Sequence, residues 1–339
     1  MITRLVEPYA GLGAYTVRAM AMEAQRTNHR RYRLEPPVSR MGSKAGFAAG
    51  VFRAFGLTPA RWAGFWLNDL DPVCHLFHMV YASSELRDAV ARRIWAMVPC
   101  PECHPDVVVQ ALEGKIKPTP ETLPAGSPGC SQCLGTGTQN DRILWERFKS
   151  EPVPGGVVDA SARALYLQSR SFQLKPVSID GKVWLEQLPA WVTCGFGPED
   201  GKENAHNPRW TTADRLAQFP PSGQMRLTQQ DATLCLPTGD SRDCVVVLDP
   251  PYEATSGYAS TSCRADVLML ARAWSDAGAL VLLHEACPLA DELGKGWQSR
   301  SASILRASRS TFWKGEEREF LTFNRPPVWW PAEQQTMGW

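Results

Sequence analysis

The chain has 339 residues, of which 44% are hydrophobic and 21% charged, and its formal net charge is +1. This composition excludes disordered and fibrous classes and is typical of a globular protein. Near-neutral charge does not exclude a nucleic-acid partner, because basic side chains can cluster locally. No secretion signal precedes the first elements, and no stretch reaches the roughly 18 apolar residues of a membrane span. We therefore expect a cytoplasmic protein without a membrane partner, in which the cysteines are reduced.

The first third of the chain alternates apolar strands with helical patterns. Residues 2–6 predict a strand, and a glycine-containing turn leads to a helical pattern over 15–24. A second helix is expected over 41–56, where Gly56 ends it. The apolar stretch 62–72 predicts a strand that runs into acidic residues, and 72–98 is helical again.

Composition changes at Pro99, where a segment rich in proline and cysteine begins and extends to residue 160. A helix is expected over 161–176, followed by a polar segment at 196–208 that predicts a mobile loop. Strands and helices alternate again from residue 225 to a closing strand at 318–325. This alternation predicts an α/β fold with a parallel or mixed sheet covered on both faces.

The sequence VVVLDPPY stands out in the last third of the chain. Four apolar residues, Val245–Leu248, predict a strand buried on both faces, so the next residues lie at the carboxyl edge of the sheet, where ligands bind. Pro250 and Pro251 stiffen this loop. Asp249 offers acceptors and Tyr252 an aromatic face, which together suit a planar ring with an amino group. A plain proline turn with a capping aspartate is the alternative interpretation.

Two other places carry candidate ligand contacts. Gly11 and Gly13 follow the first strand and allow a ligand to approach the backbone under a helix N-terminus, although an ordinary strand-to-helix turn has the same glycines. Asp69 and Asp71 follow the second strand, and we favour Asp69 because it is nearer the strand end. Asp231 follows a later strand and is explained equally well as a helix cap.

Together these segments resemble the DNA adenine N6-methyltransferases that carry a DPPY motif, in particular the divergent kind found in phages and prophages. The similar segments are LVEPYAGLGA, LNDLDP, LTQQDA, DPPY, the central stretch 162–184 and the closing stretch REFLTFNRPP. They cover about two thirds of the chain in patches. The resemblance implies a Rossmann-like fold that binds S-adenosylmethionine. It implies cofactor contacts by Glu7, Pro8, Gly11, Gly13, Asp69 and Asp231.

The resemblance also implies an activity on double-stranded DNA. The target adenine is flipped out of the duplex, as in other enzymes that work on a base. Tyr252 then stacks on the ring. Asp249 and the carbonyl of Pro250 accept hydrogen bonds from the amino group, and Pro251 belongs to the same stiff catalytic loop. Three alternatives remain open: cytosine N4 as the target, an amino group in RNA, or a catalytically silent DNA-binding zinc protein.

One segment departs from the order usual in that family. A stretch with the sequence MGSK, which normally precedes the first strand, here follows the first strand and helix. We favour a rearranged order over an unrelated insertion. The resemblance then implies that Lys44 contacts the cofactor or the active site.

Four cysteines form two C-x-x-C pairs separated by 26 residues. In a reduced compartment this spacing predicts a tetrahedral zinc site, although the separation is somewhat longer than usual and a redox pair or unconnected thiols are the alternatives. Four thiolates leave no position for a catalytic water, so the predicted zinc is structural. The predicted ligands are Cys100, Cys103, Cys130 and Cys133.

The expected organisation is a catalytic domain interrupted by an insertion. Residues 1–98 and 225–328 form the two parts of the catalytic domain, and 329–339 form a tail. The resemblance implies that the insertion 99–224, which contains the zinc ribbon at 99–140, is a target-recognition region; a merely structural role of the ribbon is the alternative. Basic residues at 29–33 and the arginines between Arg300 and Arg318 are candidate phosphate contacts, with a solvated basic surface as the alternative.

Overall fold

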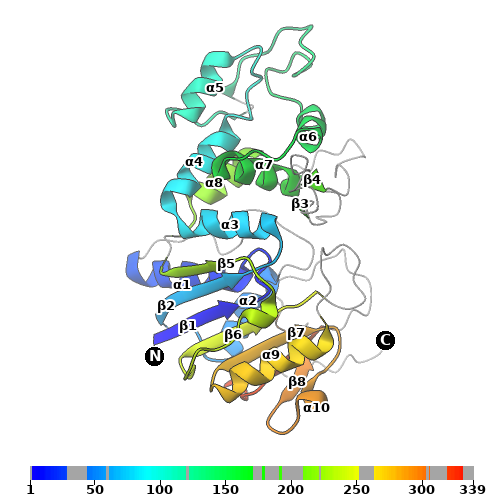
Figure 1. Cartoon of the computed structure of the whole chain (residues 1–339). Coiled ribbons are helices and arrows are strands. Elements are labelled where there is room, and N and C mark those ends of the chain that lie inside the picture. The colour runs from blue at the N-terminus through cyan, green and yellow to red at the C-terminus, as the bar shows by residue number, and fades with distance from the viewer. Residues whose placement is uncertain are drawn as a thin grey trace, which may run out of the picture. The chain divides into compact units, whose positions relative to one another are not determined.

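The chain forms two compact units, which are described separately (Figure 1). The first unit contains Met1–Glu35, Ser43–Leu70 and Gly223–Trp339, and the second contains Pro36–Gly42 and Asp71–Ser222. Residues 71–98, which the sequence assigned to the catalytic part, group with the second unit. The structure, a computed structural model, describes residues 2–28, 44–58, 61–119, 122–170, 178–179, 191–192, 209–220, 223–251, 263–302, 305 and 319–330.

The first unit is built on a seven-stranded mixed sheet with the order β5-β2-β1-β6-β7-β9-β8. The five strands from β5 to β7 are parallel, and β9 is antiparallel to both β7 and β8. The predicted α/β fold with a mixed sheet is therefore confirmed. The strands are β1 (Ile2–Glu7), β2 (Arg61–Asn68), β5 (Met225–Thr228), β6 (Cys244–Leu248), β7 (Leu280–Glu285), β8 (Gln298–Ser301) and β9 (Phe320–Phe323).

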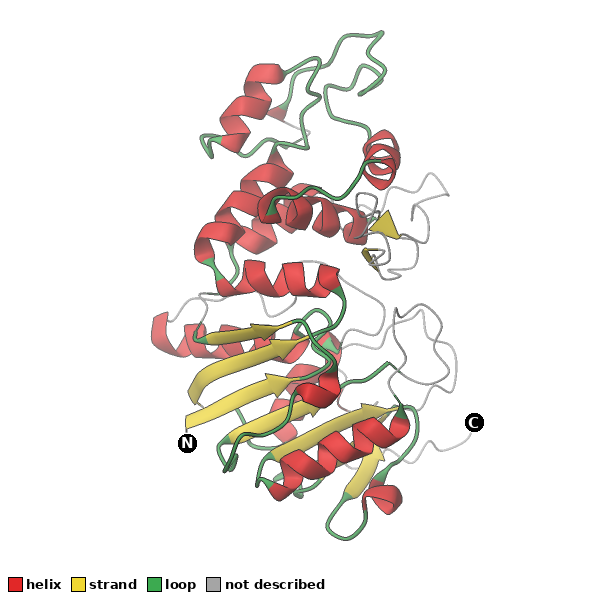
Figure 2. Cartoon of the chain, in the orientation of Figure 1, coloured by secondary structure: helices red, strands yellow, loops and turns green. Residues whose placement is uncertain are grey.

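Helices cover both faces of this sheet (Figure 2). On one face, the apolar side of α9 packs against alternate residues of β6 and β7, and Trp274 lies at the centre of that contact. On the other face, α1 and α2 pack together, and Phe52 contacts both Tyr15 and Trp62. The helical elements of this unit are α1 (Ala14–Asn28), α2 (Ala45–Ala54), the 3-10 turn η4 (Ala232–Leu234), α9 (Arg264–Asp276) and α10 (Ala290–Leu293).

The second unit is mainly helical. The helical stretch expected at 72–98 consists of two helices, because Ser83 takes an extended conformation and its hydroxyl accepts a hydrogen bond from the Leu86 N–H, which starts a new helix. No helix in the described ranges is both long and apolar enough to cross a membrane. The elements are α3 (Pro72–Ala82), α4 (Ser84–Trp95), α5 (Pro105–Leu112), α6 (Asp141–Ser150), α7 (Val157–Ser169), β3 (Ser178–Ile179), β4 (Trp191–Val192) and α8 (Arg209–Ala217).

The topology of the sheet brings distant parts of the chain to one edge. The carboxyl ends of β1, β2, β5, β6 and β7 share this edge because these strands are parallel. β9 runs the other way, with Phe320 opposite Glu285, so Glu319 just before it also lies there. The direction of winding reverses between β1 and β6, and in open α/β sheets ligands bind at such a switch point.

Candidate functional site

The turn after β1 is shaped by two glycines in the left-handed region. Gly11 has φ 50° and Gly13 has φ 63°, conformations that cost other residues about 1–2 kcal/mol. The N–H of Gly11 donates to Asp69 Oδ2 at 2.7 Å, which ties the turn to the end of β2. Apart from the residues next to it in the chain, a Cβ added to Gly11 would meet no atom within 4 Å. The turn therefore leaves space for a ligand to approach its backbone.

A buried asparagine, Asn68, holds this turn against the loop after β5. Its side-chain N–H groups donate to the carbonyls of Pro8 at 2.9 Å and Gln230 at 3.0 Å, and its Oδ1 accepts from the Gln230 N–H at 3.2 Å. Asn68 was missed in the sequence. A polar residue at the last position of an apolar strand was the signal that could have found it.

The three candidate aspartates lie in different settings. Asp69 supports the glycine turn, as described above. Asp231 is exposed and caps η4, since its Oδ1 accepts from the N–H and the hydroxyl of Thr233, and these hydrogen bonds lower the pKa of Asp231. Asp71 caps α3 by accepting from the Val73 N–H at 2.9 Å. The cap that the sequence offered as the alternative for Asp231 is present, and its cofactor contact stays a prediction.

Glu7 is the last residue of β1 and is only 4% exposed. Its Oε1 accepts a hydrogen bond of 2.8 Å from the Thr16 N–H in the first turn of α1. Burial raises the pKa of Glu7 to about 7, although the hydrogen bonds from Thr16 and Tyr15 act in the opposite direction. A buried carboxyl group that titrates near neutral pH thus lies directly beneath the glycine turn.

Asp249 follows β6 and forms an ion pair with Lys44, whose Nζ lies 3.0 Å from Asp249 Oδ1. Lys44 is the N-cap residue of α2 and is buried. Lys44, the described residue of the MGSK stretch, therefore lies at the carboxyl edge of the sheet. Burial raises the pKa of Asp249, whereas the charge of Lys44 opposes the shift. Pro250 is buried and Pro251 half-buried, while Tyr252 lies outside the described residues.

Three further residues extend this site, and none was identified in the sequence. Glu319 Oε1 lies 3.4 Å from Lys44 Nζ and 2.8 Å from Nδ1 of His284. His284 Nε2 in turn lies 2.6 Å from the hydroxyl of Tyr15. Burial raises the pKa of Glu319, but the hydrogen bond from His284 and the charge of Lys44 outweigh it and lower this pKa to about 2. Polar residues at the end of β7 and before β9 were the available signal.

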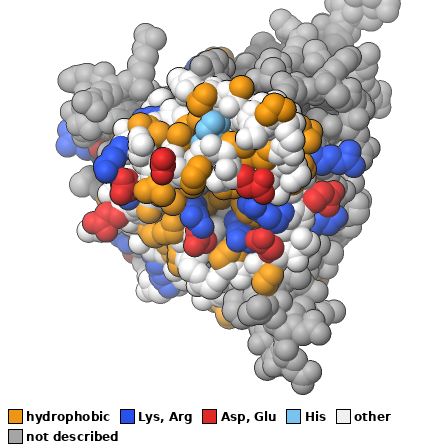
Figure 3. Space-filling model, turned by 90° about the horizontal axis from the view of Figure 1, so that it is seen from above, with side chains coloured by type: hydrophobic (Ala, Val, Ile, Leu, Met, Phe, Trp, Pro, Cys, Tyr) orange, Lys and Arg blue, Asp and Glu red, His pale blue; other side chains and the backbone are white. Residues whose placement is uncertain are grey.

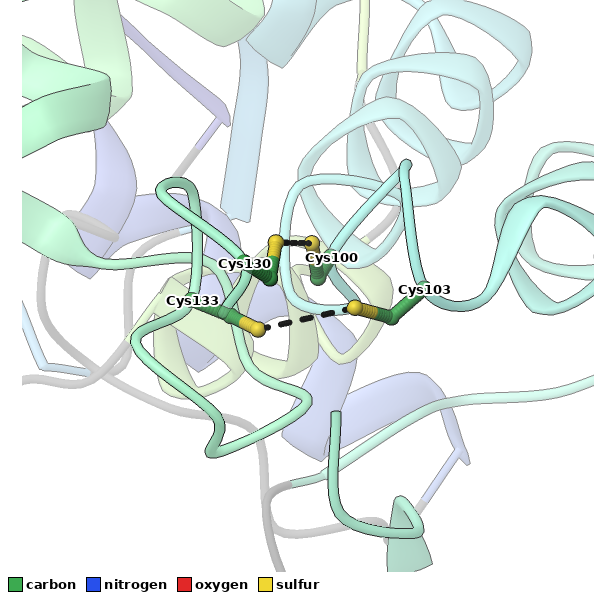
Figure 4. Close-up of side chains that lie close together, drawn as sticks. All are labelled: Cys100, Cys103, Cys130 and Cys133. Atoms are coloured by element: carbon green, nitrogen blue, oxygen red, sulfur yellow. Dashed lines mark hydrogen bonds between the residues drawn. The ribbon is translucent and has the colours of Figure 1, made fainter. Parts of the chain in front are cut away.

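The four predicted cysteine ligands form one cluster in the second unit, where Cys100 faces Cys130 and Cys103 faces Cys133 (Figure 4). The Sγ atoms of Cys100 and Cys130 are 3.6 Å apart, those of Cys103 and Cys133 are 3.7 Å apart, and all four lie within 4.8 Å of one another. A regular tetrahedron with Zn–S bonds of about 2.3 Å has edges of about 3.8 Å. The cluster could therefore hold a zinc ion with little movement.

The backbone around the cysteines makes close turns, one of which depends on a glycine at positive φ. Gly137 has φ 77°, and its carbonyl accepts from the Cys100 N–H at 2.9 Å. A Cβ at Gly137 would collide with the carbonyl oxygen of Pro124. Ser127 N–H points at Cys103 Sγ at 3.4 Å, which supplies the kind of hydrogen bond that favours a thiolate.

The predicted phosphate contacts fall largely on residues that are not described. Residues 29–33 and the arginines from 306 to 318 lie outside the described ranges. Arg300 is described, and its guanidinium lies over the ring of Trp330 at 5.4 Å. On the face shown in Figure 3, described Lys and Arg side chains alternate with acidic and hydrophobic ones.

A scan against protein-family models finds no match, and a search of curated proteins finds none either. The fold and site therefore define an α/β protein with a seven-stranded, mostly parallel sheet and a four-cysteine cluster in an insertion.

Proposed function

We propose that the protein transfers a methyl group from S-adenosylmethionine to the amino nitrogen of a nucleobase, adenine N6 in double-stranded DNA. The observation that carries this proposal is the position of Asp249. It follows β6 at the carboxyl edge and precedes two prolines, and β6 is the direct neighbour of β1, which ends at the glycine turn. An acceptor for an amino group and a turn open to a ligand are thus placed on adjacent strands.

The residues of the turn suit the cofactor. The open space at Gly11 allows close approach to the backbone, and the nearby Asp69 supplies carboxylate oxygens of the kind that hold ribose hydroxyls. The N-terminus of α1, which starts at Ala14, stabilises negative charge such as that of the cofactor's carboxylate. When bound, S-adenosylmethionine supplies an electrophilic methyl group.

The role of the loop after β6 follows from the chemistry of an amino group on an aromatic ring. Its lone pair is delocalised into the ring, so the nitrogen is a poor nucleophile. Hydrogen bonds from its two N–H groups to Asp249 and the Pro250 carbonyl draw the nitrogen toward tetrahedral geometry and localise the lone pair. With the cofactor bound, the nitrogen would bond to the methyl carbon while the methyl–sulfur bond breaks, and the sulfur would keep that electron pair and leave as a neutral thioether. The nitrogen would release one proton, which the Asp249 carboxylate can accept. Tyr252 is proposed to stack on the flipped base.

We propose that the cysteine cluster binds structural zinc and that the region around it contributes to target recognition. Four thiolates complete the coordination sphere, so the ion offers no open position for chemistry. Most of the folding energy of such small knuckles comes from the metal, because their loops bury little apolar surface.

The test of the proposed function is methylation of random-sequence DNA with isotope-labelled S-adenosylmethionine, followed by mass spectrometry of the nucleosides. Labelled N6-methyladenine is the expected product. Labelled N4-methylcytosine, or label that enters RNA in a parallel reaction, would transfer the proposal to another amino group. Binding of DNA with no binding of S-adenosylmethionine in calorimetry would favour the silent DNA-binding protein and overturn the proposal.

A further inference from the structure

A chain of buried and half-buried polar side chains connects the first turn of α1 with Asp249. It runs from Tyr15 to His284, from His284 to Glu319, and from Glu319 to Lys44, which binds Asp249. Tyr15 is 1% exposed and His284 is fully buried. Burying polar groups is costly unless each is hydrogen-bonded, so such a chain has a single arrangement that satisfies its members.

The members come from four separate elements. Tyr15 lies in the first turn of α1, Lys44 caps α2, His284 lies in β7, and Glu319 precedes β9. The phenyl ring of Phe47 lies against the imidazole, with ring centroids 5.9 Å apart, which restricts its rotation. The chain therefore holds the Lys44 amine between two carboxylates, Asp249 and Glu319, and Phe47 packs against the imidazole that binds Glu319.

We propose that Tyr15, His284 and Glu319 are positioning residues that hold Lys44 against Oδ1 of Asp249 and so present Oδ2 to the amino group of the target base. The catalytic part of this inference rests on the function proposed above. Glu319 has a specific task in it. Its Oε1 lies 3.4 Å from Lys44 Nζ and so holds the amine toward the residue that precedes β9.

The arrangement also defines hydrogen-bond directions. Burial raises the pKa of Tyr15 well above its usual range, so its hydroxyl keeps the proton and donates to His284 Nε2. The imidazole then carries its proton on Nδ1 and donates to Glu319 Oε1.

The first test measures Asp249 directly and needs no activity. In protein labelled with carbon-13 at the aspartate carboxyl groups, the Asp249 signal, assigned with Asp249→Asn, is followed against pH. The charged or titratable groups that face Asp249 are Glu7, Tyr15, Lys44, His284 and Glu319. Glu319→Gln removes a negative neighbour, so the midpoint of the Asp249 signal is expected at lower pH. Asp141→Asn, which removes the partner of Arg170 in the second unit, is the matched control and leaves the midpoint unchanged.

A second variant covers the case in which Glu319→Gln does not fold. Tyr15→Phe removes one hydroxyl and is compared with Tyr166→Phe, which removes a similarly buried hydroxyl that donates to the Asp141 carbonyl. Nitrogen-15 spectra of the histidine rings are expected to show protonated Nδ1 and unprotonated Nε2 for His284. Tyr15→Phe changes this pattern, and Tyr166→Phe preserves it.

The kinetic test separates positioning from mere stability. Because misplacement of a reacting group by about 1 Å can cost roughly a hundredfold in rate, we expect Tyr15→Phe to lower kcat at least tenfold with the Kd for S-adenosylmethionine unchanged. In Glu319→Gln, the fall of kcat at acidic pH is expected to move to lower pH, together with the midpoint of the Asp249 carbon-13 signal.

An unshifted Asp249 midpoint in folded Glu319→Gln, or equal kcat in Tyr15→Phe and Tyr166→Phe, overturns the inference. If the midpoint shifts as expected but no nucleic acid is methylated, the coupling of Glu319 to Asp249 stands and the proposed function fails.

Discussion

Asp249 is half-buried and forms an ion pair with the buried Lys44. Lys44 lies between Asp249 and Glu319, so one positive charge serves two carboxylates. The pKa of Asp249 is raised, whereas the pKa of Glu319 is lowered because Glu319 also accepts a hydrogen bond from His284. The ionised form of Asp249 is therefore the less stabilised of the two. The less stabilised carboxylate is therefore the one proposed to meet the substrate.

Asp249→Asn is expected to abolish most methyl transfer. The amide offers one acceptor oxygen and cannot take up the proton, so kcat falls by roughly 10²–10⁴-fold, as for other lost proton acceptors. Calorimetry is expected to show unchanged binding of S-adenosylmethionine. Asp243→Asn is the matched control, because Asp243 precedes the same strand at its opposite end and pairs with Arg4. Wild-type activity is also expected to fall with decreasing pH through the raised pKa of Asp249. Wild-type rates in Asp249→Asn would contradict the proposed role.

Glu7 makes stability depend on pH. Its carboxyl binds a proton in the folded protein up to about pH 7, whereas the ordinary value is 4.5. Between these values the folded state holds more protons than the unfolded state, so stability decreases as pH rises, by about 3 kcal/mol in total. Glu7→Gln is expected to flatten the decline in Tm between pH 5 and 7. The exposed Glu113→Gln serves as control, and equal slopes in Glu7→Gln and wild type would contradict the assignment.

The β1 strand and the turn after it form the candidate ligand-binding element of the first unit. The strand is central and parallel to both neighbours, which fixes where it ends. The two positive φ angles then direct the backbone N–H groups of the turn, and Asn68 holds the turn against the loop after β5. These supports all lie in the first unit.

Gly11→Ala tests whether a ligand occupies the open space at this turn. The substitution is expected to cost about 1 kcal/mol of stability, because alanine is strained at φ 50° but meets no nearby atom. Binding of S-adenosylmethionine is expected to weaken by roughly tenfold or more, equivalent to about 1.4 kcal/mol. Gly296→Ala, also at positive φ and in open space but between α10 and β8, is expected to leave the Kd unchanged. Equal Kd values in Gly11→Ala and wild type would place the cofactor elsewhere.

The two compact units separate the candidate chemistry from the candidate metal. Asp249, Lys44 and the glycine turn belong to the first unit, and the cysteine cluster belongs entirely to the second. Loss of the metal should therefore act locally. Substrate recognition, if it depends on the ribbon, can then vary without changing the cofactor site.

Metal analysis is expected to find about one zinc ion per chain, and Cys103→Ser to lose it, because a site of four thiolates needs every ligand. Hydrogen exchange is expected to rise in residues 99–140 and to stay low in the strands of the first unit. Cys263→Ser, which removes an exposed thiol outside the cluster, retains the zinc. A full complement of zinc in Cys103→Ser would contradict the assignment.

Some features of this protein could be determined from the sequence by itself, because they depend on neighbouring residues. The apolar run before Asp249 predicts a buried strand, and β6 is buried throughout. The alternation of strands and helices predicts an α/β fold. The spacing of the cysteines predicts their cluster, since each pair lies in one short loop. The polar strand β8 was missed, because its residues QSRS have no apolar pattern.

Only the tertiary structure decided which distant residues share the site. Lys44, His284 and Glu319 meet because β9 is antiparallel to β7 and begins where β7 ends, and this pairing has no local signature in the sequence. The same holds for Asn68, whose partners lie 60 and 162 positions along the chain. Side-chain types and turns are encoded locally, whereas the charge balance around Asp249 depends on the order of strands in the folded sheet.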